Sequence, residues 1–321
     1  MTSFKIVNTL DTAGAPEAKE AIEAVGELVN LPWDRALTLA AIGDADAYLA
    51  STSIVVDAEF LDHAPKLKVI GSPSTGTDHL DLTEIRRRGI TCFDISKEYD
   101  LINGFTATSE LAFTLLLALN RKLVPAQEQA KRGVWSRETY TGFQLLGKTL
   151  GILGLGRLGK ISARIGQGFG MNVIAHDIAD VSAENVEMVS LKDLLARSDV
   201  LTIHIHLRPE TDGLIGAAEF ARMKSNAILI NTSRGRIVDE PALLAAMSEK
   251  RIAGAGLDVV DGEWLSEEEL FRHPLIAYSR ENDNLLIVPH IGGATHESIY
   301  GARVFMARKV ADHLRTLQNV S

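Results

Sequence analysis

The sequence predicts an α/β protein made of two units, each with its own parallel β-sheet. Three observations support this prediction. Short apolar runs of strand type alternate with stretches of helical periodicity, the runs in the middle of the chain are almost continuously apolar, and the alternation resumes after a long apolar helix. Continuously apolar strands are typical of parallel sheets, because helices cover both faces of such sheets. Strands that alternate with helices favour right-handed crossover connections.

The elements follow in chain order. In the first hundred residues we expect strands at Phe4–Asn8, Ala47–Ala50, Lys68–Gly71 and Ile90–Phe93, and helices within Pro16–Leu28 and Asp81–Arg88. The helix that follows Asn103 is expected to join the units. Its apolar run Leu111–Leu119 is about half of what a membrane span needs, so it predicts a buried helix. The second unit is expected to contain strands at Thr149–Leu153, Asn172–His176, Val200–Ile205, Ala227–Asn231, Gly254–Asp258 and Leu285–Val288.

Composition excludes several classes of function. The 321 residues are 46% apolar and 23% charged, as in ordinary soluble proteins. A net charge of −9 disfavours general attraction to phosphate, so we expect no nucleic-acid partner. Cys92 is the only cysteine, which excludes an intrachain disulfide and fits a reducing cytosol. The residues from Met1 to Val7 lack a signal-peptide pattern, and His63, His79 and His273 show no metal-ligand spacing. We therefore expect a cytoplasmic protein that binds neither membrane nor metal.

A glycine-rich turn is the most informative local motif. Gly154, Gly156 and Gly159 come directly after an apolar strand and open a segment of helical periodicity. The first glycine permits a tight turn, the second lets a pyrophosphate approach the backbone, and the third lets the helix pack close to the strand. The amides at the helix N-terminus then face the pyrophosphate. A Rossmann-type dinucleotide site is predicted here.

The acidic residue after the next strand indicates which dinucleotide binds. Asp177 ends the strand Asn172–His176, 18 residues beyond Gly159. Its carboxylate can accept hydrogen bonds from the two ribose hydroxyls, and it would repel a 2′-phosphate. No arginine follows within the next several residues. The sequence therefore predicts NAD rather than NADP.

Three polar residues follow predicted strands, where ligands of open α/β sheets bind. They are Arg234, Glu263 and His290. A hydride exchanged with a nicotinamide must be matched by a proton exchanged with an oxygen, and histidine is suited to that proton. A carboxylate bonded to the imidazole would orient it and raise its pKa, while an arginine would bind a substrate carboxylate in two-pronged fashion.

Several motifs follow one another along the chain: Gly154-Leu-Gly-Arg-Leu-Gly, Asn231-Thr-Ser-Arg-Gly, Leu257-Asp-Val with Glu263, and Pro289-His-Ile-Gly-Gly-Ala-Thr, with the loop Gly76-Thr-Asp-His-Leu-Asp-Leu nearer the N-terminus. In this order they resemble the D-isomer-specific 2-hydroxyacid dehydrogenase family, and most of all its phosphoglycerate-dehydrogenase-like branch. The resemblance covers nearly the whole chain.

This resemblance implies an NAD-dependent oxidoreductase that interconverts a D-2-hydroxy acid and its 2-oxo acid. It implies Arg234 as substrate anchor, Glu263 as partner of the histidine and His290 as general acid/base, with substrate also bound by Ser74, Thr75 and Gly76. The implied cofactor-binding set is Gly154, Gly156, Arg157, Leu158, Gly159, Asp177, Thr232 and Asp258. It also implies two Rossmann/flavodoxin-like domains, with a discontinuous substrate domain (1–100 and 290–321), an NAD-binding domain (101–289) and a homodimer.

The chain departs from the family pattern at three places. Ser72-Pro73 stands where an arginine is often found, which puts phosphoglycerate itself in doubt. Trp264 follows Glu263 where proline is common, and His206 stands where proline is usual. Three alternatives stay open: phosphoglycerate oxidation, phosphite oxidation on the same residues, and an NAD(H)-sensing binding protein of the corepressor type. Glu263 argues against formate oxidation, because formate enzymes of this fold resemble a glutamine–histidine pair instead.

Overall fold

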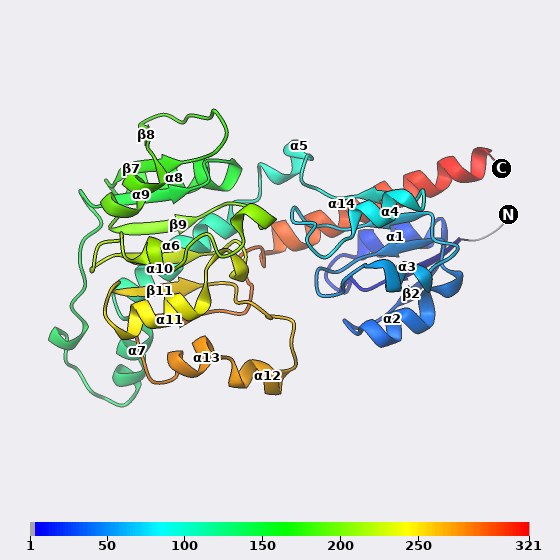
Figure 1. The fold of residues 1–321 in the computed structure, drawn as a ribbon. Coiled ribbons are helices and arrows are strands. Elements are labelled where there is room, and N and C mark those ends of the chain that lie inside the picture. The colour runs from blue at the N-terminus through cyan, green and yellow to red at the C-terminus, as the bar shows by residue number, and fades with distance from the viewer. Residues whose placement is uncertain (1–3, 321) are drawn as a thin grey trace. The chain divides into compact units, whose positions relative to one another are not determined.

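The computed structural model describes residues 4–320 and divides into two compact units (Figure 1). Residues 4–105 and 294–320 form unit 1, and residues 106–293 form unit 2. The expectation that the chain lacks a signal peptide rests partly on Met1 to Ser3, which lie outside the described residues. Both sheets are parallel throughout, which confirms the predicted fold class.

Unit 1 contains a five-stranded sheet in the order β2-β1-β3-β4-β5. Ile6 and Val7 are consecutive residues of β1, and they belong to the hydrophobic cores on opposite faces of this sheet. Apolar residues of α1 and α14 fill one core, and those of α3 and α4 help to fill the other. The strands are β1 Phe4–Asn8, β2 Gly26–Asn30, β3 Ala47–Leu49, β4 Val69–Gly71 and β5 Thr91–Phe93, and the helices are α1 Pro16–Glu23, α2 Arg35–Ala41, α3 Ala58–Asp62, α4 Leu82–Arg87, α5 Tyr99–Ile102 and α14 His296–Val320.

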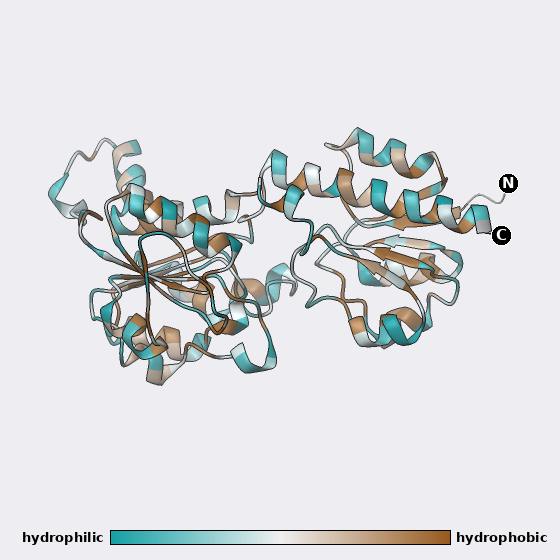
Figure 2. Cartoon of the chain, turned by 90° about the horizontal axis from the view of Figure 1, so that it is seen from above, coloured by the Kyte–Doolittle hydropathy of each residue, from teal (hydrophilic) through white to brown (hydrophobic). Residues whose placement is uncertain are grey.

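Unit 2 contains a seven-stranded sheet in the order β12-β11-β10-β9-β6-β7-β8. Its strands are brown in Figure 2, as expected for a sheet covered on both faces. The strands are β6 Thr149–Leu153, β7 Asn172–His176, β8 Val186–Met188, β9 Val200–Ile203, β10 Ile228–Asn231, β11 Gly254–Leu257 and β12 Leu285–Ile287. The helices are α6 Ala107–Asn120, α7 Leu123–Lys131, α8 Arg157–Gly168, α9 Leu191–Arg197, α10 Ala217–Phe220, α11 Glu240–Ser248, α12 Glu267–Arg272 and α13 Pro274–Ser279.

The predicted helix Pro16–Leu28 is wrong in its second half, because α1 ends at Glu23 and β2 begins at Gly26. Strand β2 lies at the sheet edge and only partly buries its side chains, so its sequence lacks the apolar run that identified the other strands. A Cβ atom at Gly26 would lie 2.1 Å from the carbonyl oxygen of Phe4, so glycine lets β2 pack against β1. The edge strand β8 was not predicted for the same reason: its side chains are largely exposed.

The limits of the units differ by a few residues from the expected ones. Helix α5 packs against α14 in unit 1, so unit 1 extends to Phe105 rather than to residue 100. At the other limit, the carboxylate of Asp258 accepts hydrogen bonds from the amides of Ile291 (2.6 Å) and Gly292 (2.9 Å). These bonds keep residues 290–293 in unit 2. His290 therefore belongs to unit 2, whereas the boundary expected from the sequence placed it in the substrate domain (1–100 and 290–321).

By length and composition alone, one segment among the described residues, Tyr99–Asn120, is apolar enough to cross a membrane. Its main part is α6, and half of the residues in α6 are buried within unit 2, among them Phe113, Leu115 and Leu116. The core helix of a globular protein meets the same criteria, so the expectation of a buried helix holds for Leu111–Leu119.

Candidate active site

The parallel sheet of unit 2 brings the ends of distant sequence segments to one edge. The glycine turn follows β6, Asp177 follows β7, Arg234 follows β10, Asp258 follows β11 and His290 follows β12. The chain leaves β6 toward β7 on one side of the sheet and returns through β9 on the other, so the glycine turn lies at a topological switch point. Ligands of open α/β sheets bind at such points.

The glycine turn has the shape that a dinucleotide requires. Gly154 has a φ of +96°, and a Cβ atom there would lie 2.6 Å from the carbonyl oxygen of His204. A Cβ atom at Gly159 would lie 2.1 Å from the carbonyl oxygen of Gly154. A Cβ atom at Gly156 would meet nothing within 4 Å, and this residue is the N-cap of α8 and has no side chain to cap the helix. The turn is thus tight on its inner side and open at Gly156, so it fits a pyrophosphate.

Asp177 lies beside this turn and faces a pocket. Its carboxylate accepts hydrogen bonds from the amides of Leu155 (2.7 Å) and Ala179 (2.9 Å). The pocket has a volume of about 350 Å³, and its lining also includes Asp180 and Met188. The carboxylate therefore both holds the turn and presents negative charge where the ribose of a dinucleotide is expected.

The other predicted cofactor contacts lie in α8 and after β10. Thr232 is buried, and its hydroxyl oxygen has no hydrogen-bond partner among the described residues. Arg157 is the first residue of α8, and burial lowers the pKa of its guanidinium. The carbonyl of Leu158 accepts a hydrogen bond from the hydroxyl of Ser109 (3.0 Å), which attaches α8 to α6. An unpartnered buried hydroxyl is a group that a bound ligand can satisfy.

Arg234 lies in a turn that the side chain of Asn231 stabilises. The amide of Asn231 donates to the carbonyl oxygen of Arg234 (2.9 Å), and its oxygen accepts from the backbone of Ser233 (3.0 Å). A Cβ atom at Gly235 would lie 2.2 Å from the backbone of Val260. This close approach places the Arg234 turn against the segment that leads to Glu263.

Glu263 and His290 form a hydrogen-bonded pair. Glu263 Oε1 lies 2.9 Å from His290 Nδ1, and the two side chains are 17% and 31% exposed. Burial lowers the pKa of His290, but the hydrogen bond and charge of Glu263 and the charge of Asp258 outweigh it, so the pKa is raised. The charge of Arg234 acts in the opposite direction, so Glu263, Asp258 and Arg234 all lie within electrostatic reach of the His290 ring. Nδ1 is the ring nitrogen that Glu263 engages.

The backbone of His290 has a φ of +51°, in the left-handed region that non-glycine residues rarely adopt. Its amide donates to the carbonyl oxygen of Asp258 (2.8 Å), and the Asp258 carboxylate holds the next two amides. Burial raises the pKa of this carboxyl. The sequence implied a cofactor contact for Asp258 but gave no sign of this role in holding the loop.

The hydrogen bonds of His204 beside the glycine turn were not predicted from the sequence. His204 Nε2 lies 2.9 Å from the hydroxyl of Ser162 and 3.1 Å from that of Thr202, and burial lowers the pKa of His204 to about 4. These bonds attach α8 to the end of β9. The sequence gave no signal for this role, because His204 lay inside the predicted strand Val200–Ile205, whereas β9 ends at Ile203. His206, two residues on, is exposed.

The predicted substrate loop lies in unit 1, after β4. The amide of Gly76 donates to the hydroxyl of Ser74 (3.2 Å), and the carbonyl of Ser74 accepts from the amide of Ile95 (3.2 Å). Thr75 lies between them. Just before this loop, the buried hydroxyl of Ser72 lies 3.0 Å from His79 Nε2.

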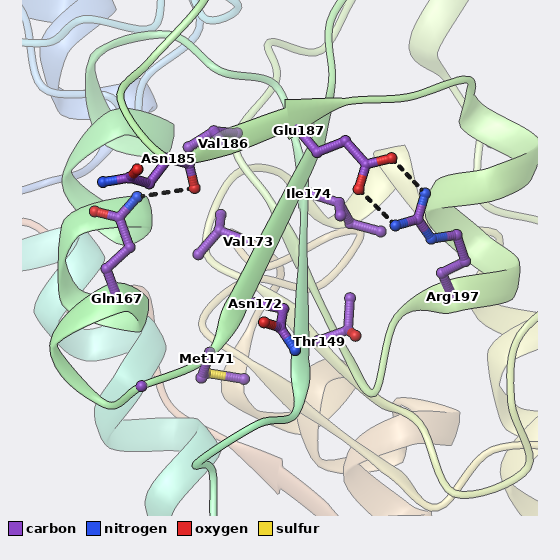
Figure 3. Close-up of a pocket in the computed structure, with 11 residues that line it drawn as sticks. Thr149, Gln167, Met171, Asn172, Val173, Ile174, Asn185, Val186, Glu187 and Arg197 are labelled. Carbon is purple, nitrogen blue, oxygen red and sulfur yellow. Dashed lines mark hydrogen bonds and ion pairs between the residues drawn. The ribbon is translucent and has the colours of Figure 1, made fainter.

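A cleft of about 800 Å³ lies elsewhere, at the amino ends of β6, β7 and β8 (Figure 3). Glu187 and Arg197 pair across it through two bonds of 2.6 and 2.8 Å, so their charges compensate each other. Parallel sheets bind ligands at the opposite, carboxyl edge. This cleft therefore lies apart from the candidate site.

A glycine turn at the switch point of a parallel sheet, with a histidine–carboxylate pair at the same edge, is typical of a nicotinamide-dependent oxidoreductase. Residues 113–292 match the family model described as D-isomer specific 2-hydroxyacid dehydrogenase, NAD binding domain. The chain belongs to this family. The family, the fold, the enzyme class and NAD as cofactor, all predicted from the sequence, are thereby confirmed.

Three similar proteins illustrate the range of the family. The chain is 40% identical to a glyoxylate reductase of Thermococcus litoralis, over 87% of this chain and 82% of that protein. It is 34% identical to D-3-phosphoglycerate dehydrogenase of Mycobacterium leprae, over 88% of this chain and only 52% of that protein. The structure of D-lactate dehydrogenase from Aquifex aeolicus, complexed with NAD and lactic acid, superimposes with a TM-score of 0.84 at 26% identity, covering 97% of this chain and 96% of that one.

Proposed function

We propose that this NAD-dependent D-2-hydroxyacid dehydrogenase acts on a short, unphosphorylated 2-oxo acid and its 2-hydroxy acid. In this proposal His290 is the acid–base residue, Glu263 its partner and Arg234 the substrate anchor. The observation that carries the proposal is the 2.9 Å bond between Glu263 and His290. It fixes one imidazole nitrogen and leaves the other for the substrate.

The proton balance follows from this geometry. When bound, the nicotinamide would supply the hydride chemistry at the substrate's second carbon. In reduction, protonated His290 donates the Nε2 proton to the carbonyl oxygen, and in oxidation neutral His290 accepts the hydroxyl proton. The raised pKa of His290 favours the proton-donating form.

Arg234 supplies the positive charge that an anionic substrate needs in an acidic protein. A guanidinium binds a carboxylate through two parallel hydrogen bonds, which fixes the orientation of the neighbouring carbonyl. Since Arg234 already lowers the pKa of His290 by its charge, a substrate carboxylate bound there would relieve part of that effect. Substrate binding would therefore favour the proton-donating form.

Unit 1 is proposed as the substrate domain and unit 2 as the NAD domain. The loop Ser74–Gly76 follows β4 at the carboxyl edge of its sheet, where ligands bind, and can offer backbone amides to the substrate carboxylate. Ser72 stands where the phosphoglycerate enzymes often carry arginine, and its buried hydroxyl is already bonded to His79. The absence of a cation at this position favours an unphosphorylated substrate, in line with the similarity to glyoxylate reductases.

A substrate panel tests the proposal. Purified protein is mixed with NADH and glyoxylate, hydroxypyruvate or 3-phosphohydroxypyruvate, and separately with NAD and phosphite, while absorbance of the reduced nicotinamide is followed. We expect kcat/KM for glyoxylate to exceed that for the phosphorylated acid at least about tenfold, because a bound phosphate lacks its cation. Preference for the phosphorylated acid or for phosphite would overturn the substrate assignment. Tight NADH binding without any turnover would favour the NAD(H)-sensing alternative.

The role of His290 has its own test. His290→Gln should lower kcat by roughly 10²–10⁴-fold, as expected for loss of a general acid, while the Kd for NADH stays nearly unchanged. His63→Gln, an exposed change in unit 1, is the matched control. Turnover by His290→Gln within a few fold of the original would show that another group carries the proton.

We also propose a homodimer formed through the segment around α7. No residue of α7 is buried, and this segment runs along the outside of unit 2 (Figure 1). It exposes several large apolar side chains: Leu123, Val124, Val134, Trp135 and Leu146. Exposed apolar residues gathered in one segment indicate an interface. Light scattering should give twice the monomer mass, and Leu123→Glu with Trp135→Glu should give monomers; a dimer that persists with both charges would exclude this surface.

A cytoplasmic location is the last part of the proposal. The only cysteine, Cys92, is partly buried, and burial raises its pKa to about 11, so it is suited to remain a thiol. Fractionation of cells that express the tagged protein tests the location, and recovery outside the cytoplasmic fraction would contradict it.

A further inference from the structure

One turn carries two consecutive side chains that reach the same imidazole. Gly262 has a φ of +72°, and its carbonyl accepts a hydrogen bond from the amide of Leu265 (2.9 Å). Within this turn, Glu263 bonds to the edge of the His290 ring through Nδ1. The indole of Trp264 stacks on the same ring, with centroids 5.8 Å apart and an angle of 29° between the planes.

The exposure of Trp264 argues against a simple packing role. Trp264 is 51% exposed, whereas a large aromatic residue that serves only to fill a core is buried. The contact with His290 is therefore not a by-product of core formation. The family commonly has proline after this glutamate, so the aromatic ring is a property of this chain.

We propose that Trp264 is a positioning residue for His290. The indole of Trp264 covers one face of the imidazole, fixes the plane of the imidazole and stabilises its protonated form. This inference rests on the proposed function of His290. Three charged groups also act on His290: Glu263, Asp258 and Arg234. An aromatic face within about 6 Å of a cation adds an attraction that none of these three supplies. In reduction, the reacting histidine must hold its proton until the substrate takes it, and Trp264 favours that state.

Tryptophan fluorescence tests the contact without reference to activity. The chain has three tryptophans, so Trp33→Phe with Trp135→Phe leaves Trp264 as the only indole. A protonated imidazole in contact quenches indole emission more strongly than a neutral one. We expect the emission of this variant to fall as the pH is lowered through the pKa of His290, and to lose this transition when His290→Gln is added. Emission without a transition, or the same transition without His290, would overturn the proposal.

The pH profile of the reaction tests the consequence. Trp264→Leu keeps an apolar side chain but removes the aromatic face, whereas Trp264→Phe keeps a face. In Trp264→Leu, the pH at which kcat/KM for reduction declines should fall by about 0.5 units, the size of a half-exposed cation–π contact. Trp264→Phe should retain most of the original profile. Equal profiles in all three proteins, or equal losses in both variants, would contradict a positioning role.

The two measurements separate this proposal from the proposed function. If no 2-oxo acid is turned over but the fluorescence transition depends on His290, the contact stands and the reaction assignment fails. If turnover requires His290, but Trp264 emission shows no pH transition and the Trp264 variants keep the original pH profile, the function stands and this inference fails.

Discussion

Replacing Glu263 by glutamine tests the mechanism most directly, because it keeps the shape of the side chain and removes its charge. In the present structure the pKa of His290 is lowered by burial and by Arg234 and raised by Glu263 and Asp258, with a net increase. In Glu263→Gln only Asp258 still raises it. A hydrogen bond to a charged group contributes about 1.5–3 kcal/mol, and both side chains of the pair are less than one third exposed, so solvent screens it little. At 1.36 kcal/mol per pKa unit, we expect the pKa of His290 to fall by about 1–2 units.

The sign of the effect on activity depends on the direction of the reaction. Reduction needs protonated His290, so its rate is retained below the pKa of His290 and lost as the pH rises through it. In Glu263→Gln this loss should occur about 1–2 pH units lower. Oxidation needs neutral His290, so its rate at slightly acid pH should suffer much less, or even rise relative to reduction. The ratio of the two rates, and not either rate alone, is the diagnostic quantity.

The assay is kcat/KM between pH 5 and 9 in both directions, followed through the absorbance of the reduced nicotinamide. Glu267→Gln is the matched control, because Glu267 is an exposed acid in the first turn of α12. Its profile should coincide with that of the original protein. If Glu263→Gln lowers both directions equally without moving either pH midpoint, then Glu263 orients the ring but does not set its pKa, and the electrostatic part of the mechanism is refuted.

Two further predictions concern the cofactor and the loop of His290. Asp177→Ala should weaken the preference for NAD over NADP roughly tenfold or more, because the negative charge that opposes a 2′-phosphate is removed. The ratio of kcat/KM with the two reduced cofactors measures this preference. An unchanged ratio would contradict the ribose role of Asp177. Asp258→Asn should lower the free energy of unfolding by about 1–3 kcal/mol and should also lower kcat, because the new side chain has one oxygen in place of the two that accept from the amides of Ile291 and Gly292. A Tm and a kcat equal to those of the original protein would show that the left-handed backbone at His290 does not depend on this carboxylate.

The strands could be predicted from the sequence where burial is complete. Strands β1, β6 and β7 have the predicted bounds, because each contains a buried apolar stretch that stands out from the helical segments around it. Strand β9 ends at Ile203 rather than Ile205, because its pairing with β6 and β10 stops at Ile203. The edge strands β2 and β8 have exposed side chains, so no hydrophobic pattern identified them.

The candidate site could be predicted in its residue types but not in its supports. Arg234, Glu263 and His290 were found because each follows an apolar strand, and parallel pairing alone places such residues at one edge. The bond from the Asp258 carboxylate to two backbone amides depends on the path of the loop after β12, which a sequence does not reveal. The stacking of Trp264 on His290 likewise depends on the turn at Gly262. Both supports are loop geometries, which lack the periodicity that makes strands and helices legible.

The net charge of −9 acquires a different meaning once these contacts are placed. An acidic protein that binds an anionic cofactor and an anionic substrate must concentrate positive potential locally. In unit 2 that potential comes from the amides at the start of α8 and from Arg234, while Asp177, Asp258 and Glu263 supply negative charge at the same edge. Each of these carboxylates accepts a hydrogen bond from a backbone amide or from His290, so each is committed to a donor of this chain. Negative charge at the edge therefore holds the turn, the loop and the imidazole in place, while Arg234 is the cation that we propose for the substrate anion.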